Sequence, residues 1–228
     1  MMRIDLISAV PDILFSPLNY SILKRAQDKN KVEIVVHNVR DYAYDKHKQI
    51  DDKPFGGKAG MLLKPEPFFA CIEKLQSERK YDYVIFTSPK GKVFNQQIAN
   101  RFSLAENILI ITGHYKGIDE RVREYFATDE VSIGNFILSG GELLGLVIVD
   151  AIVRLIPGVL NDSASALDDS FQDGEIIEAP QFTRPSSFRG MDVPEVLLTG
   201  NHAAIKKWEE EQSKVLTKNW KMINNISE

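Results

Sequence analysis

The chain has 228 residues, enough for one large domain or for a domain with a smaller companion. Its composition, 43% hydrophobic and 26% charged, is that of a globular protein with a sizeable core. The longest uncharged apolar run, Leu143 to Val149, is far shorter than the ~20 residues that cross a bilayer, which excludes a membrane-spanning helix. The single cysteine, Cys71, excludes an intrachain disulfide and suits a cytoplasmic protein, and Arg3 and Asp5 argue against a signal peptide.

The net charge of −4 argues mildly against a nucleic-acid partner, but the charges are unevenly distributed along the chain. Five lysines and two aspartates lie between residues 46 and 64. Six acidic residues and no basic one lie between residues 162 and 178. A basic surface facing a phosphate backbone therefore stays open as the less favoured interpretation.

Four strands are predicted in alternation with helices. Apolar, β-branched runs predict the strands, at residues 3–10, 31–39, 83–87 and 108–112. Apolar residues at helical spacing predict the helices, in a stretch through residue 14 and at residues 19–28, 65–79, 95–102, 120–126 and 142–155. Because the helix at 142–155 is apolar on nearly every face, we expect it to be buried. The alternation indicates the α/β class, with a mostly parallel sheet covered on both faces.

The remaining segments read as loops and a helical tail. Residues 41–60 have no apolar period and are expected to form a long loop. Residues 161–173, rich in Asp, Ser and Ala, read as a mobile linker. Asn201 is expected to cap a helix, and a second helix is expected at 218–223.

Three turns at predicted strand ends are expected to form a ligand pocket. They are Ser88-Pro89, Gly113-His114-Tyr115 and Ser132-Ile133-Gly134, and α/β folds bind ligands where such turns meet. Single glycines more often serve only tight turns, but the ordered set that ends in Gly140 and Gly141 favours a ligand. The chain lacks a G-x-G-x-x-G fingerprint, a Walker A motif and paired zinc ligands.

Several segments in order resemble the bacterial tRNA (guanine-N1)-methyltransferases, members of the knotted SPOUT methyltransferase superfamily. The segments are PFGGKAGMLLKPEP, TSPKG, GHYKGIDER, SIGNFILSGGEL, IPGVL, DDSFQDG and APQFTRPSSFRGMDVPEVLLTGNHAAIKKW. The resemblance extends from Met2 to Trp208. It implies a methyltransferase domain at residues 1–160 with a deep trefoil knot, an acidic linker at 161–175 and a small, mainly helical tRNA-recognition domain at 176–228.

The resemblance also implies a reaction: transfer of a methyl group from S-adenosylmethionine to N1 of guanine 37, just 3′ of the anticodon of tRNA. It implies that the donor is held by the predicted turns and the segment that follows them, at Ser88, Pro89, Gly113, Tyr115, Ile133, Gly134, Asn135, Phe136, Ile137, Leu138, Gly140 and Gly141. Asp169 would be the general base at N1, and Arg154 would stabilise the negative charge that develops on the guanine O6. Taken alone, Asp168 and Asp169 are more typical of solvated linker charges, and Arg154 of a helix-end cation able to pair with Asp150.

A homodimer with shared active sites is implied, so that Asp169 acts in trans, and so is a Mg²⁺ dependence whose site the sequence does not locate. Candidate phosphate contacts are basic residues in the loop and the tail, namely Lys46, Lys48, Lys53, Lys58, Arg184, Arg189, His202, Lys206 and Lys207.

Some residues depart from the family pattern: Lys116 stands where an acidic residue is usual, and His114, Phe136, Leu144 and Lys58-Ala59 also differ. Two alternatives remain: a methyltransferase of the same superfamily that acts on another RNA, and an RNA-binding protein that has lost catalysis.

Overall fold

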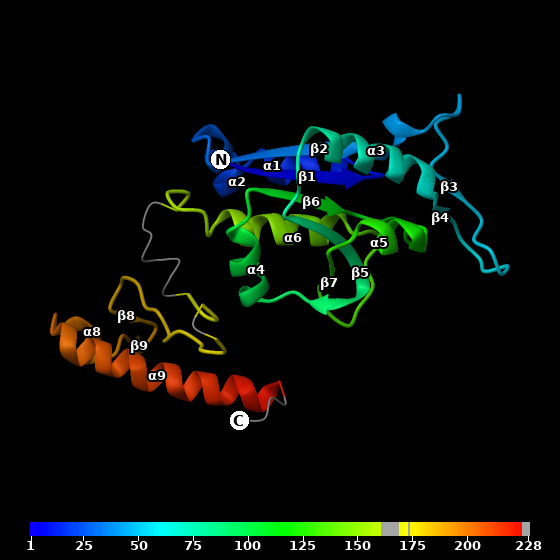
Figure 1. Ribbon diagram of the computed structural model, residues 1–228. Helices are drawn as coiled ribbons and strands as arrows, with labels where there is room; N and C mark the ends of the chain where they lie inside the picture. The colour runs from blue at the N-terminus through cyan, green and yellow to red at the C-terminus, as the bar shows by residue number, and fades with distance from the viewer. Residues whose placement is uncertain (161–168, 173, 225–228) are drawn as a thin grey trace. The chain divides into compact units, whose positions relative to one another are not determined.

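Five parallel strands form the centre of the N-terminal part of the computed structural model, which describes residues 1–160, 169–172 and 174–224 (Figure 1). Their order in the sheet is β2-β1-β6-β5-β7, and every neighbouring pair is parallel. The strands are β1 (Met2–Ser8), β2 (Val32–Asn38), β5 (Tyr83–Val93), β6 (Asn107–Ile111) and β7 (Asp129–Ser132). The predicted α/β class and parallel sheet are confirmed.

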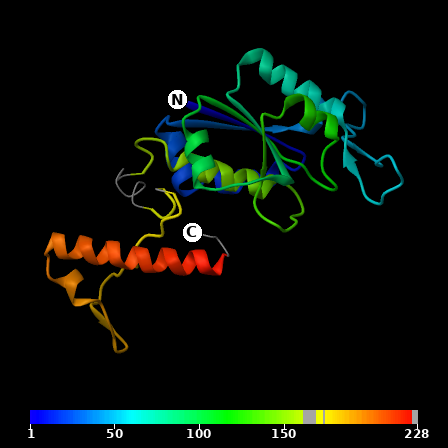
Figure 2. The ribbon, with the colours of Figure 1, turned by 60° about the horizontal axis from the view of Figure 1, so that its bottom comes forward.

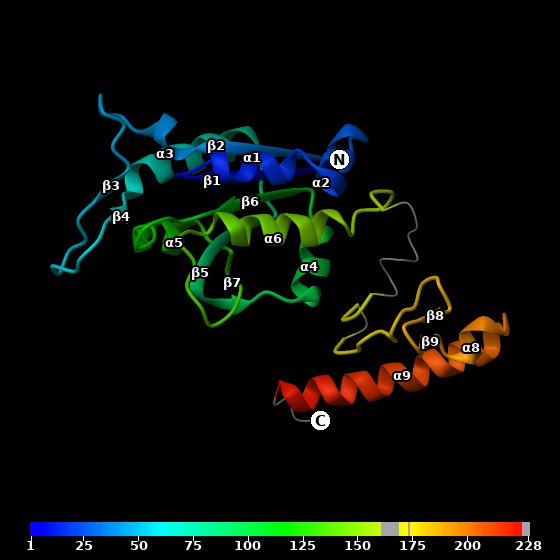
Figure 3. The ribbon, with the colours of Figure 1, turned by 180° about the vertical axis from the view of Figure 1, so that it is seen from behind.

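The chain divides into two compact units, Met1–Asp162 and Ser163–Glu228. In the first unit, the helices connect successive strands of the sheet along the chain, except the last helix, which follows the last strand, and they pack on its two faces (Figure 3). They are α1 (Asp12–Leu18), α2 (Ser21–Asp28), the 3-10 helix η1 (Val39–Tyr42), α3 (Pro65–Glu78), α4 (Gln96–Ser103), α5 (Glu120–Phe126) and α6 (Glu142–Val153). Within the described residues, no helix is both long enough and apolar enough to cross a membrane.

The alternation of side chains along the strands explains why both faces are covered. In β6, Ile108 and Ile110 point to a core shared with α1, α2, α4 and α6, while Leu109 and Ile111 point to a core shared with α3 and α5. All four side chains are fully buried, as expected for a parallel strand between two helical layers.

The prediction that α6 is buried all round was wrong. Leu143 and Val147 are 48% and 42% exposed, and Asp150 is also exposed. These residues are spaced by four and three positions, close to one helical turn, so they form a single stripe on the side of α6 that faces away from the sheet. Hydrophobicity on every face of a helix predicts burial only if every face has a partner, and in the described part of the first unit one stripe of α6 stays exposed.

The strand and loop predictions also need correction. β7 was not among the four predicted strands, because its sequence DEVS has no apolar run. The loop at 41–60 contains β3 (Asp51–Asp52), which pairs antiparallel with β4 (Leu62–Leu63). β5 extends six residues beyond Thr87 and resumes its pairing with β7 at Lys92.

The described part of the second unit contains a hairpin and two helices (Figure 2). The elements are β8 (Ser187–Phe188), β9 (Met191–Asp192), α8 (Glu195–Leu198) and α9 (His202–Ile223), and no residue of either helix is buried. The predicted cap is confirmed, because Asn201 Oδ1 accepts a hydrogen bond from the Ala204 N–H at 3.2 Å. The prediction of a separate helix at residues 218–223 was wrong. No Gly or Pro interrupts α9, so this single helix includes those residues. The predicted linker at 161–173 lies largely outside the described residues.

A buried carboxylate lies on β1, on the face covered by α3. Asp5 is fully buried and accepts hydrogen bonds from Arg3 Nη2 at 2.8 Å and from the Tyr81 hydroxyl at 2.8 Å, and His37 Nε2 lies 2.6 Å from its Oδ1. Burial alone would raise the pKa of the Asp5 carboxyl, but these hydrogen bonds outweigh burial and lower the pKa to about 2.

We predict that Asp5→Asn lowers the free energy of unfolding by about 2 kcal/mol at neutral pH, since the pKa of Asp5 is lower in the folded chain than in the unfolded chain. This contribution is complete above a pH of about 4 and is lost as the pH falls toward 2. Urea unfolding at several pH values measures it. The variant should lose less stability than the wild type over that interval, and equal losses would contradict the assignment. Tyr81→Phe, which removes one hydrogen bond, should cost about 1 kcal/mol.

Candidate functional site

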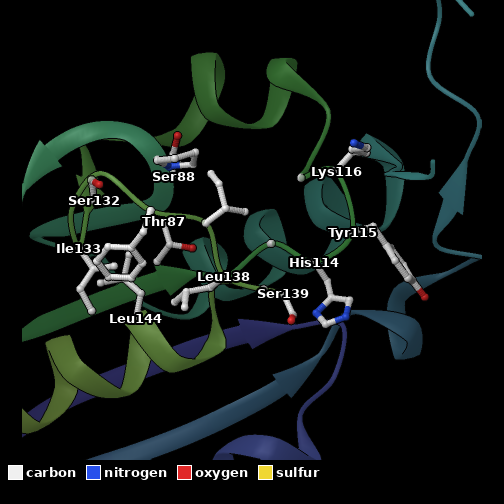
Figure 4. Close-up of a pocket in the computed structure, with 17 residues that line it drawn as sticks. Thr87, Ser88, His114, Tyr115, Lys116, Ser132, Ile133, Leu138, Ser139 and Leu144 are labelled. Atoms are coloured by element: carbon white, nitrogen blue, oxygen red, sulfur yellow. The ribbon is translucent and has the colours of Figure 1, made fainter. Parts of the chain in front are cut away.

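The five parallel strands end at the same edge of the sheet, and a cavity of about 400 Å³ opens there. Its wall comes from the segment after Thr87 in β5, the turn after β6 and the segment between β7 and α6 (Figure 4). The lining residues are Thr87, Ser88, Pro89, Gly113, His114, Tyr115, Lys116, Gly117, Ser132, Ile133, Phe136, Ile137, Leu138, Ser139, Gly140, Gly141 and Leu144. Three segments far apart in the sequence therefore form one site.

Two of these segments are joined directly by their backbones. The Gly141 N–H donates to the Gly113 carbonyl at 2.6 Å, and His114 and Gly140 form an isolated antiparallel bridge. A Cβ on Gly141 would lie 2.2 Å from Thr87 Oγ1 and 3.1 Å from the Gly113 nitrogen. Only glycine therefore allows the start of α6 to approach β5 and β6 this closely.

Next to this contact in the chain is a buried carboxylate in the first turn of α6. Glu142 is 2% exposed, accepts a hydrogen bond from Ser8 Oγ at 3.0 Å and lies 3.5 Å from His114 Nδ1. Ser8 ends β1 and His114 follows β6, so the side chain of Glu142 connects the ends of two adjacent strands to α6. A carboxylate in the first turn of a helix also interacts favourably with the helix dipole.

The third wall is an interruption within β5. Thr87 and Lys92 both pair with Val131 of β7, so residues 88–91 leave the ladder and return to it. The Lys90 N–H donates to Ser88 Oγ at 3.1 Å, which closes this excursion as a turn. Ser88 and Pro89 line the cavity as a result. The predicted turn at this point is thus a bulge between two halves of one strand.

The cavity is apolar at one end and polar at the other. Ile133, Leu138 and Leu144 lie toward one end, and His114 and Lys116 lie toward the other (Figure 4). Lys116 is the only Lys, Arg, Asp or Glu in the part of the wall that the structure describes. The site thus suits a ligand with an apolar ring and a charged or polar tail.

Most of the residues predicted to hold a ligand lie on this wall. Gly134 and Asn135 are the exceptions: they are neighbours of lining residues in the chain but do not line the cavity. The lining residues outside the predicted turns and donor contacts are Thr87, Lys116, Gly117, Ser139 and Leu144. Each is within three residues of a predicted contact, so adjacency to the three turns was the available signal.

The comparisons with known proteins agree over almost the whole chain. The family model described as tRNA (Guanine-1)-methyltransferase TrmD matches residues 2–223. The chain belongs to this TrmD family. It is 56% identical over 212 residues to the tRNA (guanine-N(1)-)-methyltransferase of Azobacteroides pseudotrichonymphae, with 93% of this chain and 95% of the relative covered. Its identity to the enzyme of that name from Bacteroides thetaiotaomicron is 54% over 217 residues, covering 95% and 96%. For Cytophaga hutchinsonii the identity is 55% over 217 residues, covering 95% and 92%.

The two predicted catalytic residues of this TrmD-family chain lie in different units. Arg154 follows the last residue of α6, is partly buried, and donates its N–H to the Asp150 carbonyl at 3.1 Å. Asp169 is partly buried in the second unit, where its carbonyl accepts from the Gln172 N–H at 3.3 Å. It lines a hollow of that unit together with His202 and Trp208. Asp168 lies outside the described residues.

The Mg²⁺ implied by the resemblance to the TrmD family finds no fitting set of ligands in the described part of the chain. No three His, Cys, Asp or Glu side chains there lie together in a way that could hold a metal ion. The side chains of the cavity wall include an ammonium and, among the described residues, no carboxylate. Hard divalent cations need oxygen ligands, preferably carboxylates, so the described wall does not suit one.

Gly141→Ala is predicted to disrupt the cavity of this TrmD-family protein. The new methyl group would overlap Thr87 Oγ1, and overpacking of this kind costs about 1–3 kcal/mol. In thermal unfolding, Gly141→Ala should have a lower Tm than Gly113→Ala, because the methyl group at position 113 would meet the Ile118 side chain at 3.2 Å and no backbone atom closer than 3.7 Å. Adding Thr87→Ala to Gly141→Ala should restore part of the loss. A Tm equal to that of the wild type would mean that the close approach is not required.

Proposed function

We propose that this chain transfers a methyl group from S-adenosylmethionine to N1 of the guanine just 3′ of the anticodon of tRNA. The observation that carries the proposal is the family match over residues 2–223, in a chain whose strand ends enclose a cavity with an apolar and a polar end. Relatives more than half identical are named tRNA (guanine-N(1)-)-methyltransferases. We infer a cytoplasmic location, in keeping with tRNA as substrate and with the free thiol of Cys71.

The donor would lie along the cavity. Its adenine ring fits the apolar end, between Ile133 and Leu138, where the backbone of residues 137–139 lines the cavity beside the edge of the ring. Ser88, Pro89, Gly113 and Tyr115 would complete the enclosure. With the sulfonium near the middle of the cavity, its methyl group would be presented to a base that enters from solvent.

The chemistry requires removal of a proton. N1 of guanine carries hydrogen and has no free lone pair for attack until that proton leaves. We assign the Asp169 carboxylate as the general base that takes the proton. The electron pair on N1 then forms the bond to the methyl carbon, and the carbon–sulfur bond breaks to leave the neutral thioether. The Arg154 guanidinium would stabilise the negative charge that grows on O6.

The second unit and the loop lysines would contact the RNA. Lys46, Lys53 and Lys58 are exposed on the segment at 41–60, and the basic residues of the second unit named above are exposed as well. Lys48 is exposed but pairs with Asp41 at 3.2 Å. Such contacts position a nucleic acid without reading its sequence. We assign residues 176–228 to tRNA recognition and residues 161–175 to the linker between the two domains.

A homodimer would explain the exposed stripe on α6. Leu143 and Val147 are exposed on α6, and Ile13 and Phe15 are exposed on α1, a helix in contact with α6. Exposed apolar side chains on neighbouring helices are typical of a subunit interface. In such a dimer Asp169 would act on the cavity of the partner subunit. The family also implies a trefoil knot, and the joined segments around Ser88, Gly113 and 132–155 are where it would lie.

Methyl transfer to two tRNA transcripts tests the function. The transcripts differ only by guanine or adenine at the position 3′ of the anticodon, and the donor carries a labelled methyl group. We expect label on the guanine transcript alone. Label on both, or on ribosomal RNA instead, would indicate a methyltransferase with another target. Donor binding without transfer to any RNA would support an RNA-binding protein that has lost catalysis.

Mixed dimers test the catalytic assignment. Asp169→Ala and Arg154→Ala should each abolish most turnover and leave donor affinity within about twofold of wild type, because neither residue lines the cavity that the structure describes. If Asp169 acts in trans, co-refolding equal amounts of the two variants should restore about a quarter of wild-type turnover, since half of the dimers are mixed and each mixed dimer has one intact site. No recovery would place both residues in the same subunit's site.

A further inference from the structure

Lys116 provides the positive charge of the cavity. Within the described residues, no other side chain of the wall carries a full charge, and no described ion pair involves this ammonium. The side chain is exposed and lies at the opposite end of the cavity from Ile133 (Figure 4). An unpaired cation at one end of a largely apolar cavity favours a ligand with an anionic group at that end.

The backbone of Lys116 is fixed by the neighbouring loop. Its N–H donates to the Met61 carbonyl at 3.0 Å, and the Leu63 N–H donates to the Gly117 carbonyl at 3.0 Å. The turn is closed by the Gly117 N–H, which donates to the His114 carbonyl at 2.9 Å. The segment at 60–63 thus holds the turn from both sides of Lys116, and the Cα of Lys116 has little freedom to move.

Gly60 determines where the stem of the lysine lies. Its backbone has φ +98°, and a Cβ there would be 3.0 Å from both Cγ and Cε of Lys116. The methylene groups therefore lie against the bare backbone of Gly60, in space that any other residue would occupy. This contact reduces the number of rotamers open to the lysine, so less entropy is lost when the ammonium binds a ligand.

We propose that Lys116 binds the α-carboxylate of the methionine moiety of the donor and that Gly60 positions it. The inference rests on the proposed function. With the adenine at the apolar end, the amino-acid tail points toward Lys116, and its carboxylate is the only anionic group of the donor. An ammonium–carboxylate hydrogen bond fixes the direction in which the donor lies in the cavity.

The same charge bears on the metal. An ammonium at this end of the cavity repels a divalent cation, so a carboxylate held by Lys116 needs no bridging Mg²⁺. An acidic side chain at this position would give the wall a charge of the opposite sign. The residue at position 116 therefore decides which ion the cavity favours as well as which group contacts the donor.

Binding of two product analogues to the full-length protein tests the proposal without RNA. The analogues are S-adenosylhomocysteine and its decarboxylated form, which keeps the amine and lacks only the carboxylate. Isothermal titration calorimetry should show that Lys116→Met lowers the affinity for S-adenosylhomocysteine about tenfold. The affinity for the decarboxylated analogue should stay within about twofold of the wild-type value. Lys116→Arg should retain the preference for the carboxylate. Lys90→Met, which removes an exposed lysine outside the cavity wall, is the matched control and should change neither affinity.

Two further measurements sharpen the test. Gly60→Ala should reproduce the selective loss in part, with Lys116 still present, because the new methyl group displaces its stem. Addition of Mg²⁺ or of a chelator should leave the wild-type affinity for S-adenosylhomocysteine unchanged. A strong dependence on Mg²⁺ would overturn the assignment of the carboxylate to Lys116.

The remaining outcomes separate the two proposals. If Lys116→Met lowered the affinity for both analogues equally, the role of the lysine would be structural, and the inference would be overturned. Unchanged affinity for both, with weaker tRNA binding, would assign the ammonium to an RNA phosphate and would also overturn it. If the wild type bound neither analogue, the proposed donor itself would be wrong.

Discussion

The hydrogen bond from the Gly141 N–H to the Gly113 carbonyl is the contact on which the site depends. It places the first turn of α6 against the end of β6 and leaves room for Thr87 but for no additional carbon atom. Because that contact fixes two of the three walls, the cavity exists before any ligand arrives. The Glu142 carboxylate accepts a hydrogen bond from Ser8, which connects the first turn of α6 to the end of β1 as well. A pre-formed site of this kind needs little reorganisation on binding, so more of the interaction energy remains available for affinity.

Features with a local physical cause could be predicted from the sequence. The continuous apolar run of β6 reflects burial on both faces, the helix at Glu120–Phe126 was predicted with the bounds observed, and Asn201 forms its cap because the hydrogen bond spans three residues. The three turns were also predictable, since strand ends and glycines mark them. The cavity that these turns enclose could also be predicted, because parallel strands present their carboxyl ends at the same edge of a sheet.

Features that depend on distant partners could not be predicted. Asp5 and Tyr81 are 76 residues apart, and nothing in either local sequence indicates that the two side chains share a hydrogen bond. Lys116 and Gly60 meet only because the segment around β4 crosses the turn after β6. The prediction that α6 is buried on every face failed for a related reason. An apolar pattern indicates that a surface prefers burial but not which molecule covers it. Composition and periodicity therefore described the scaffold, and tertiary contacts decided the charges of the site.

Val131 pairs with Thr87 on one side of the bulge in β5 and with Lys92 on the other, so a strand at the edge of the sheet closes one wall of the cavity. That wall is complete only after β7 has docked, and docking joins segments 44 residues apart in the chain. A ligand held by the bulge can recognise only the finished sheet. Its effect on folding kinetics is therefore one-sided: it lengthens the lifetime of the folded chain by slowing unfolding, while the rate of folding stays the same.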